Sequence, residues 1–241
     1  MQLKTSAIVL HSIKYSDTSL ILHTYTETHG RMAYVVTGVK SKKSVLRSSM
    51  LMPLTILDLE TDYNPNKDLQ RIKESHIGYA FKSLPFDPSK NALAIFMAEM
   101  LYRSLKEPHT DPELYGFLHQ SICALDGTQS GIGNFHLSFL IQFSRFMGFE
   151  PQHSTYADNT CFDLQNGIFI LHQQALGSYL NKNDSRLFAV VCGLNYQNMA
   201  EYTFTKEEKK LLLTHLLSYY QIHLHRFSHI KSLDILHQLF A

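Results

Sequence analysis

Cysteine is scarce in this chain of 241 residues, which has only Cys123, Cys161 and Cys192. The number is odd, and no two of the three are close in sequence. This pattern excludes a disulfide framework and the Cys-x-x-Cys spacing of a metal knuckle. We therefore expect reduced, mostly buried thiols in a cytoplasmic protein.

Long hydrophobic runs are also missing. No stretch approaches the roughly 20 apolar residues that a membrane span needs, so we expect no membrane partner. The first fifteen residues, MQLKTSAIVLHSIKY, contain too short an apolar stretch for a signal peptide. They predict a strand instead.

Familiar catalytic motifs are absent from the sequence. It has no GxSxG motif, no Walker-type glycine loop and no glycine-rich dinucleotide turn. Fourteen histidines are present, but none has the HExxH spacing, and the acidic residues of the second part are too scattered for a two-metal nuclease. We expect structural histidines and no enzyme activity, with a hydrolase as the most distant alternative.

The formal net charge of +1 hides an asymmetry along the chain. Residues 1–80 contain ten Lys and Arg against seven Asp and Glu, whereas residues 81–241 contain twelve against fourteen. The first third is therefore the better candidate for a nucleic-acid-binding face. Because 44% of the residues are hydrophobic and 18% are charged, we also expect a substantial core.

The first 80 residues predict five short strands with no helix long enough for a crossover. Gly30 can take a positive φ and closes a hairpin between the second and third strands. We predict a small antiparallel barrel of the OB-fold type, which commonly binds single-stranded nucleic acid or oligosaccharide. The predicted strands are residues 5–14, 19–26, 31–37, 54–61 and 69–79.

A cationic stretch interrupts these strands, and we call residues 38–47, GVKSKKSVLR, the basic segment. It has four positive charges, two serines and no acidic residue, which favours contact with a polyanion. The alternative is an ordinary solvated loop. The candidate phosphate contacts are Arg31, Lys40, Lys42, Lys43, Arg47, Arg71 and Lys73. Tyr15, Tyr25 and Tyr34 are candidates for base stacking or, alternatively, for the barrel core.

Residues 82–91, KSLPFDPSKN, predict a domain boundary, with Ser89 as the N-cap of a helix. Beyond it the apolar spacing becomes helical, which predicts a packed bundle. A Thr205 capping box starts a helix that is apolar nearly all round and should therefore be central. The predicted helices are residues 91–105, 111–127, 132–147 and 205–225, with further helices from Gln174 and Ser185. Between them, residues 161–171 predict a hairpin with an Asn166-Gly167 turn.

In these features the chain resembles the RecO family of bacterial DNA-repair proteins over essentially its whole length. The resemblance is strongest in residues 7–44, AIVLHSIKYSDTSLILHTYTETHGRMAYVVTGVKSKKS. There the Tyr15-Ser16-Asp17 turn, the strand of residues 20–26, Gly30-Arg31 and the basic segment follow the family's order and spacing. The closing stretch HRFSHIKSLDIL, residues 225–236, is also similar to the family's end.

The resemblance implies a two-domain α+β protein: an OB-fold barrel over residues 1–81 and an α-helical domain over residues 82–241. It implies a mediator that binds single- and double-stranded DNA, anneals complementary strands and helps to load the RecA recombinase. The implied partners are RecR and the C-terminal tail of the single-strand-binding protein. Arg103 and Lys231, each flanked by apolar residues, are candidates for receiving that acidic tail, or else simply complement helix dipoles.

The sequence departs from the family in residues 149–172, where many relatives carry four cysteines in a zinc-binding insertion. Here only Cys161 remains, and His153 and His172 bring the local ligands to three at most. Because a tetrahedral zinc site needs four ligands, we predict a hairpin without zinc. The alternative function is a protein-interaction scaffold whose barrel docks on a partner without touching DNA.

Overall fold

The computed structural model describes residues 1–38, 44–171, 177–225, 227 and 229–240. It divides into two compact units, Met1–Gly127 and Thr128–Ala241. The first unit therefore holds helices as well as strands. The two units are separated after Gly127. The boundary predicted at residues 82–91 marks instead where strands give way to helices, and it stays a prediction.

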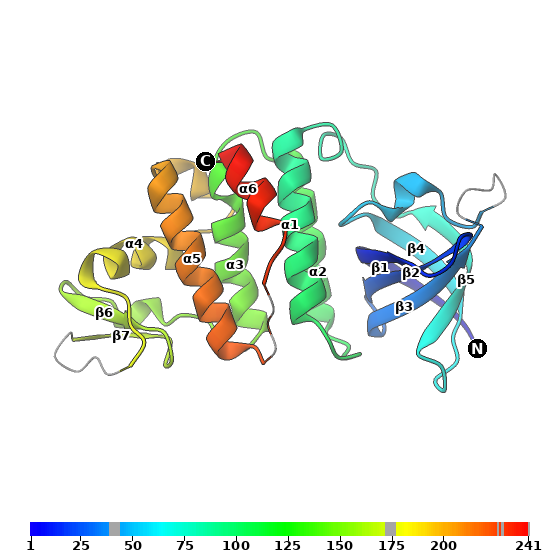
Figure 1. Ribbon diagram of the computed structural model, residues 1–241, viewed down its shortest axis with the longest axis horizontal. Coiled ribbons are helices and arrows are strands. Elements are labelled where there is room, and N and C mark those ends of the chain that lie inside the picture. The colour runs from blue at the N-terminus through cyan, green and yellow to red at the C-terminus, as the bar shows by residue number, and fades with distance from the viewer. Residues whose placement is uncertain (39–43, 172–176, 226, 228, 241) are drawn as a thin grey trace. The chain divides into compact units, whose positions relative to one another are not determined.

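The first unit contains a closed five-stranded barrel (Figure 1). Its strands are β1 (Gln2–Lys14), β2 (Ser19–Thr26), β3 (Gly30–Thr37), β4 (Ile56–Asp62) and β5 (Leu69–Ile77). Their order around the barrel is β1-β2-β3-β5-β4, and β4 also pairs with β1. This confirms the predicted OB-fold. The barrel is not wholly antiparallel, however, because β3 and β5 run parallel.

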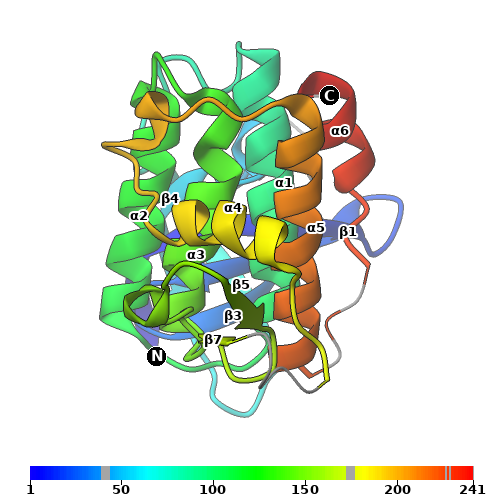
Figure 2. The same cartoon turned by 90° about the vertical axis from the view of Figure 1, so that its left-hand side faces the viewer.

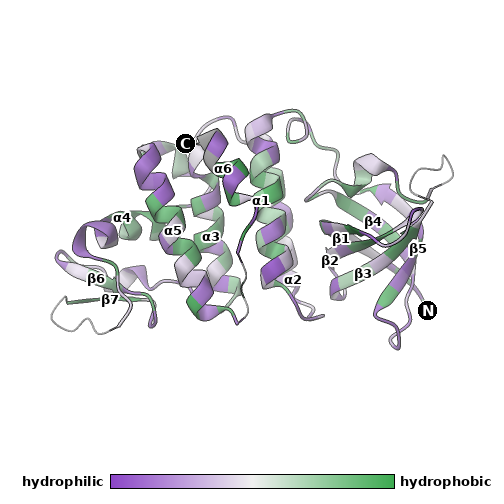
Figure 3. Cartoon of the chain, in the orientation of Figure 1, coloured by the Kyte–Doolittle hydropathy of each residue, from purple (hydrophilic) through white to green (hydrophobic). Residues whose placement is uncertain are grey.

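The barrel core is formed largely by every second residue along the strands. Leu22 on β2 and Tyr34 and Val36 on β3 are buried with Val9, Leu57 and Leu59 in one cluster. Side chains at the intervening positions face outward, since successive residues of a strand point to opposite faces. Figure 3 accordingly shows both hydrophobic and hydrophilic residues along the strands.

Two helices complete the first unit, α1 (Pro88–Ser104) and α2 (Pro112–Gly127), with the short turn η1 (Ser48–Leu51) between β3 and β4. The predicted N-cap Ser89 is wrong: the Asp87 carboxylate accepts from the backbone N–H groups of Ser89 and Lys90 and so caps α1. The Asp111 carboxylate caps α2 by accepting from the Leu114 N–H at 2.9 Å.

The connection between α1 and α2 lies against the β2–β3 turn. Gly30 in that turn has φ 58°, and a Cβ built on it would lie 2.0 Å from the His109 carbonyl oxygen. The Tyr115 hydroxyl on α2 donates to Ser6 Oγ at 2.8 Å. The helices are therefore packed on the outside of the barrel.

The second unit contains α3 (Phe135–Phe146), α4 (Lys182–Cys192), α5 (Lys206–His223) and α6 (Leu233–Phe240). Figure 2 shows α4 crossing in front of α3 and α5, and these three helices pack on one another. The capping box at Thr205 is confirmed. Helix α5 is not fully enclosed, because Lys210, Thr214 and Gln221 are exposed. Helix α4 begins at Lys182 rather than Ser185, and the helix predicted from Gln174 starts outside the described residues.

A two-stranded hairpin lies between α3 and α4 in the chain. Its strand β6 (Thr160–Asp163) is antiparallel to β7 (Ile168–Leu171). Asp163 pairs with Ile168, so the connection spans residues 164–167 and ends with Asn166 and Gly167. Gly167 has φ 68°, which a residue with a side chain rarely adopts. The short 3-10 turns of this unit are η2 (Ile132–Asn134), η3 (His153–Thr155) and η5 (Met199–Glu201).

Candidate nucleic-acid interface

Within the described residues, the outer surface of the barrel carries an apolar row that is exposed at Ile13 and partly buried at Ile21 and Val35. Ile13 on β1 lies opposite Ile21 on β2, Ile21 lies opposite Val35 on β3, and Val35 lies opposite Arg71 on β5. The row faces outward because the neighbours Leu22, Tyr34 and Val36 fill the core. Tyr15 lies two residues after Ile13 and extends the row. Its backbone N–H donates to the Ser19 carbonyl at 3.0 Å, which continues the pairing of β1 with β2. We call Ile13, Tyr15, Ile21, Val35 and Arg71 the open face.

The other half of this outer surface is covered by α1. His11 and His23 lie opposite each other on β1 and β2, and their ring centroids are 4.7 and 5.2 Å from that of Tyr102 on α1. The change of face that brings His11 outward comes from a β-bulge between Val9 and His11. The open face is therefore what the helix leaves exposed.

Arg31 lies in the covered half. Its guanidinium carbon is 4.3 Å from the Tyr102 ring centroid, and Nη1 donates to the carbonyls of Tyr102 and Leu105 at 3.3 and 3.2 Å. Burial lowers the pKa of Arg31 to about 10, against the stabilising effect of Tyr102. Because this cation already neutralises the carbonyl end of α1, we leave Arg31 out of the proposed interface.

Both described ends of the basic segment are held at the barrel. The Gly38 N–H donates to the Thr18 carbonyl at 2.7 Å, next to the β1–β2 turn. On the return, Ser75 Oγ on β5 donates to the Val45 carbonyl, and the Leu46 side chain is fully buried in the core. Arg47 follows and is exposed. Lys40, Lys42 and Lys43 lie outside the described residues.

A hollow of about 270 Å³ lies between the end of the basic segment and the open face. Its lining includes Val35, Val45 and the exposed Arg71. Arg71 makes no ion pair within the described part of the chain. The structure thus brings Arg71 next to the return of the basic segment, which the sequence spacing alone did not show.

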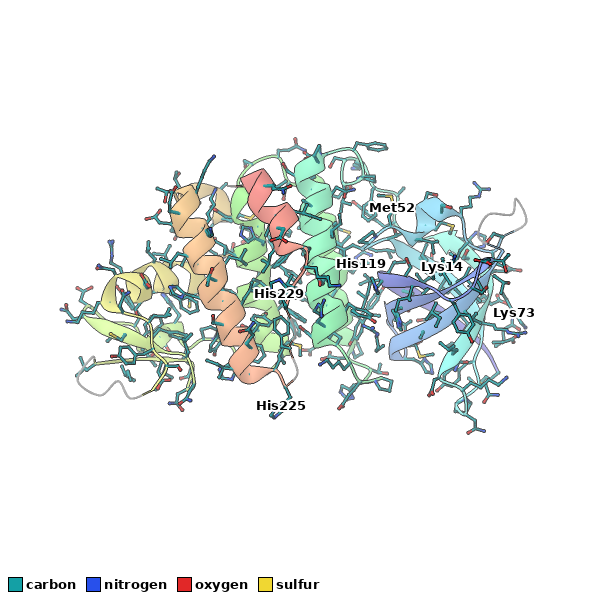
Figure 4. The ribbon with its side chains drawn as sticks, in the orientation of Figure 1. Lys14, Met52, Lys73, His119, His225 and His229 are labelled. Atoms are coloured by element: carbon teal, nitrogen blue, oxygen red, sulfur yellow. The ribbon has the colours of Figure 1, made fainter. Side chains whose placement is uncertain are left out.

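Lys73 differs from Arg71 because a β-bulge occurs beside it. Glu60 pairs with Glu74 and Thr61 pairs with Ile72, so Lys73 is the extra residue. Its Nζ lies 2.9 Å from Asp62 Oδ1 in an exposed ion pair. Figure 4 labels Lys73 and Lys14 on the barrel. Lys14 is also exposed and paired, with Asp17 at 3.0 Å.

The three tyrosines considered for base stacking have different surroundings. Tyr15 is 63% exposed, whereas Tyr25 and Tyr34 are buried. Tyr34 points into the barrel core, and Tyr25 is covered on the outside, where its hydroxyl donates to the His109 carbonyl at 3.5 Å. The prediction that Tyr25 or Tyr34 stacks on bases is therefore wrong, and Tyr15 remains as the candidate for base stacking.

The barrel surface over β1, β4 and β5 has the opposite charge, which the sequence analysis missed. A hollow of about 390 Å³ there has four acidic residues among the nine that line it. Lys4 pairs with one of them, Glu60, at 3.5 Å. The alternation of Asp58 and Glu60 along β4 is the sequence signal for this side. A phosphate backbone is repelled here, which favours the open face. The acidic residues are Glu27, Asp58, Glu60 and Glu74.

The two residues predicted to receive a peptide tail belong to different compact units. Arg103 in the first unit pairs with Glu99, with Nη2 at 2.7 Å and Nε at 2.8 Å from Oε1. Lys231 in the second unit is exposed. The peptide site stays a prediction.

The hairpin region offers few metal ligands. Cys161 is fully buried beside Phe162, a core residue, and His172 lies outside the described residues. Within residues 1–38, 44–171, 177–225, 227 and 229–240, no group of three or more His, Cys, Asp or Glu side chains is arranged to hold a metal ion. His215 Nε2 and Asp184 Oδ2 form a pair at 2.9 Å. The same described ranges contain no helix that is long and apolar enough to span a membrane.

Comparison with known proteins gives one consistent family. Residues 1–81 match the family described as Recombination protein O N terminal, and residues 85–234 match Recombination protein O C terminal. The chain is 37% identical to the DNA repair protein RecO of Phocaeicola vulgatus over 99% of both chains. It is 39% identical to that of Bacteroides fragilis over 98% of both, and 33% identical to that of Flavobacterium psychrophilum over 100% of both. The chain therefore belongs to the RecO family of DNA repair proteins.

Proposed function

We propose that this protein is a DNA-binding recombination mediator. It binds single- and double-stranded DNA, anneals complementary strands and, with RecR, helps to load the RecA recombinase onto strands coated by single-strand-binding protein. Membership of the RecO family and the OB-fold barrel support this proposal. The proposed site of action is the cytoplasm, at the nucleoid during repair.

The observation that carries the proposal is that both described ends of the basic segment are held at the barrel, one of them beside Arg71 of the open face. Gly38 leaves the barrel at the β1–β2 turn, Val45 returns beside β5, and Arg71 borders the same hollow as Val45. The lysines of the basic segment connect these two fixed points in sequence. A phosphate backbone that crosses the open face would meet Arg71 at β5, and we expect the lysines of the basic segment to add to this positive charge.

Annealing by such a surface requires no nucleotide hydrolysis. Two strands repel each other through their phosphates, and a cationic surface lowers that repulsion while holding both strands close. The acidic surface around Asp58 and Glu74 keeps DNA from the other side of the barrel. We expect no catalytic group and no bound zinc to take part.

Binding and annealing of fluorescent oligonucleotides test the proposal. We expect Arg71→Glu, and Lys40, Lys42 and Lys43→Glu together, to weaken binding and slow annealing. A matched control is Lys210→Glu on the exposed side of α5, which should behave like the unchanged protein. If the barrel variants bind DNA normally, the assigned surface is wrong. If the chain captures RecR but never DNA, the scaffold alternative is favoured.

The peptide site needs a separate measurement. A synthetic peptide that copies the acidic tail of the single-strand-binding protein, with its apolar end, should bind the full chain more weakly after Lys231→Glu or Arg103→Glu. Because Arg103 is paired with Glu99, its substitution also perturbs α1. A loss of binding in the Arg103 variant alone is therefore insufficient support.

A further inference from the structure

The covered half of the barrel surface brings two histidines against one aromatic ring. His11 on β1 and His23 on β2 are cross-strand neighbours, and both of their rings contact the Tyr102 ring of α1. The β-bulge after Val9 is what turns His11 to this side of the strand. Both imidazoles therefore lie where the C-terminal end of α1 (Pro88–Ser104) meets the barrel.

The charges around these two imidazoles have a positive excess. In the described part of the chain, the charged side chains that face them are Arg31 on β3, and Glu99 and Arg103 on α1. Glu99 is already paired with Arg103. Two arginines against one glutamate leave an excess of one positive charge. Protonation of both histidines would raise that excess to three, inside a contact that is partly shielded from water.

We propose that the contact of Tyr102 with His11 and His23 is a pH-operated clasp, which in acid releases the C-terminal end of α1 from the barrel while both remain folded. Opening lets each charged imidazole reach water and move away from the two arginines. It also uncovers the half of the barrel surface that α1 otherwise hides. The clasp does not depend on the proposed function.

The direction of the switch follows from where the imidazoles titrate. Burial, together with Arg31 and His11, lowers the pKa of His23 to about 4. Burial and Arg31 also lower the pKa of His11, against the opposing effect of Glu99. In the open clasp both imidazoles titrate near 6.5. The closed form thus binds fewer protons, so the free energy that favours it is largest above about pH 6.5 and falls as the pH drops toward 4.

The N-terminal end of α1 is held by groups that respond differently to acid. There Lys90 donates to the Asp126 carbonyl oxygen, and the Asp126 carboxylate accepts from the backbone N–H groups of Lys82, Ser83 and Leu84. Burial raises the pKa of Asp126, but these hydrogen bonds outweigh burial and lower it below its usual range. The carboxylate is therefore still charged while the histidines gain protons, so release begins at the C-terminal end of the helix.

Hydrogen exchange of the full chain, followed by mass spectrometry at about pH 7.5 and pH 5 and corrected for the intrinsic pH dependence of exchange, tests the clasp. We expect opening of residues 98–104 to become at least about tenfold more frequent at the lower pH. A histidine whose pKa rises from about 4 to about 6.5 on opening predicts a change of this order. Residues 88–94 of the same helix, and strand β4, should keep their protection.

Variants that cannot gain charge supply the controls. His11→Gln together with His23→Gln should make the exchange of residues 98–104 nearly independent of pH. His76→Gln removes an exposed histidine from the same barrel and should leave the acid response unchanged. Glu99→Gln, which keeps both histidines, should increase opening at both pH values because it removes a carboxylate that faces them.

Two results would overturn the clasp. One is loss of protection along the whole of α1 and β4 at the same pH, which would mean global unfolding. The other is an acid response of residues 98–104 that persists without the two histidines, or that Glu99→Gln does not change. Oligonucleotide binding is measured separately, so failure of the clasp leaves the proposed function standing.

Discussion

Lys90 Nζ on α1 donates to the Asp126 carbonyl oxygen at the end of α2 at 2.7 Å. The same Nζ donates to Ser83 Oγ at 2.8 Å, so a single buried ammonium group joins both helices to the segment that follows the barrel. The Asp126 carboxylate completes this joint: it accepts from the backbone N–H groups of Lys82, Ser83 and Leu84 at 2.9, 2.8 and 2.7 Å.

The joint predicts that Asp126→Ala destabilises the protein. Removing the carboxylate leaves three backbone donors without partners, of which Leu84 is buried. We expect a loss of about 2–4 kcal/mol in the free energy of unfolding, measured by urea denaturation. The matched control, Asp158→Ala, removes an exposed carboxylate and should change stability by less than about 0.5 kcal/mol. Equal effects in the two variants would contradict this role for Asp126.

Two buried tyrosines predict opposite responses to the loss of a hydroxyl group. Tyr34 Oη has no hydrogen-bond partner in the described part of the chain, whereas the Tyr220 hydroxyl donates to the Leu140 carbonyl at 2.6 Å. Tyr34→Phe should leave stability unchanged or raise it by up to about 1 kcal/mol, and Tyr220→Phe should lower it by about 1 kcal/mol. Thermal unfolding of the two variants measures this difference. A marked loss in Tyr34→Phe would mean that its hydroxyl is paired.

The contact between the barrel and α1 predicts acid sensitivity. Burial, together with Arg31 and His11, lowers the pKa of His23 to about 4. Burial, Arg31 and Arg103 lower the pKa of His11, against an opposing effect of Glu99. In the unfolded chain a histidine titrates near 6.5.

Since protonation favours the unfolded chain, the stability present above about pH 6.5 should fall as the pH drops toward 4. Thermal unfolding across this range measures the fall, and His23→Gln should make it shallower. NMR titration of the His23 ring gives a direct check. A ring that titrates near 6.5 in the folded protein would refute the explanation.

We predict that the protein binds no zinc and that a metal chelator does not change its stability. The Cys161 side chain is buried in the core, and the described residues contain no group of three suitable ligands. Metal analysis of the purified protein should therefore find no stoichiometric zinc. A chelator should leave the unfolding curve unchanged. One zinc per chain, with unfolding on chelation, would show that the hairpin region holds a metal site.

Much of the barrel could be predicted because its strands alternate and end at turn residues. The strand Ser19–Thr26 has the predicted bounds, and the others differ by one to three residues. Alternation could not reveal the bulges beside His11 and Lys73, which change the face of a strand without changing its composition.

The candidate site was harder to predict for a physical reason. Arg31 and Tyr25 do face outward, as strand periodicity indicates. Helix α1 and the segment before α2 then cover them through Tyr102 and His109. Those contacts join residues more than 70 positions apart, so the sequence of the strands contains no trace of them. Only the structure distinguishes covered from open positions on one continuous surface.

The salt dependence of DNA binding tests the central claim, that the basic segment and the open face hold a phosphate backbone. The affinity for a single-stranded oligonucleotide should fall linearly on a double-logarithmic plot against salt concentration, with a slope of about −0.7 for each phosphate neutralised. Replacing Lys40, Lys42 and Lys43 with alanine should make that slope shallower by about 2. A slope near zero in the unchanged protein, or the same slope in the alanine variant, would contradict the account.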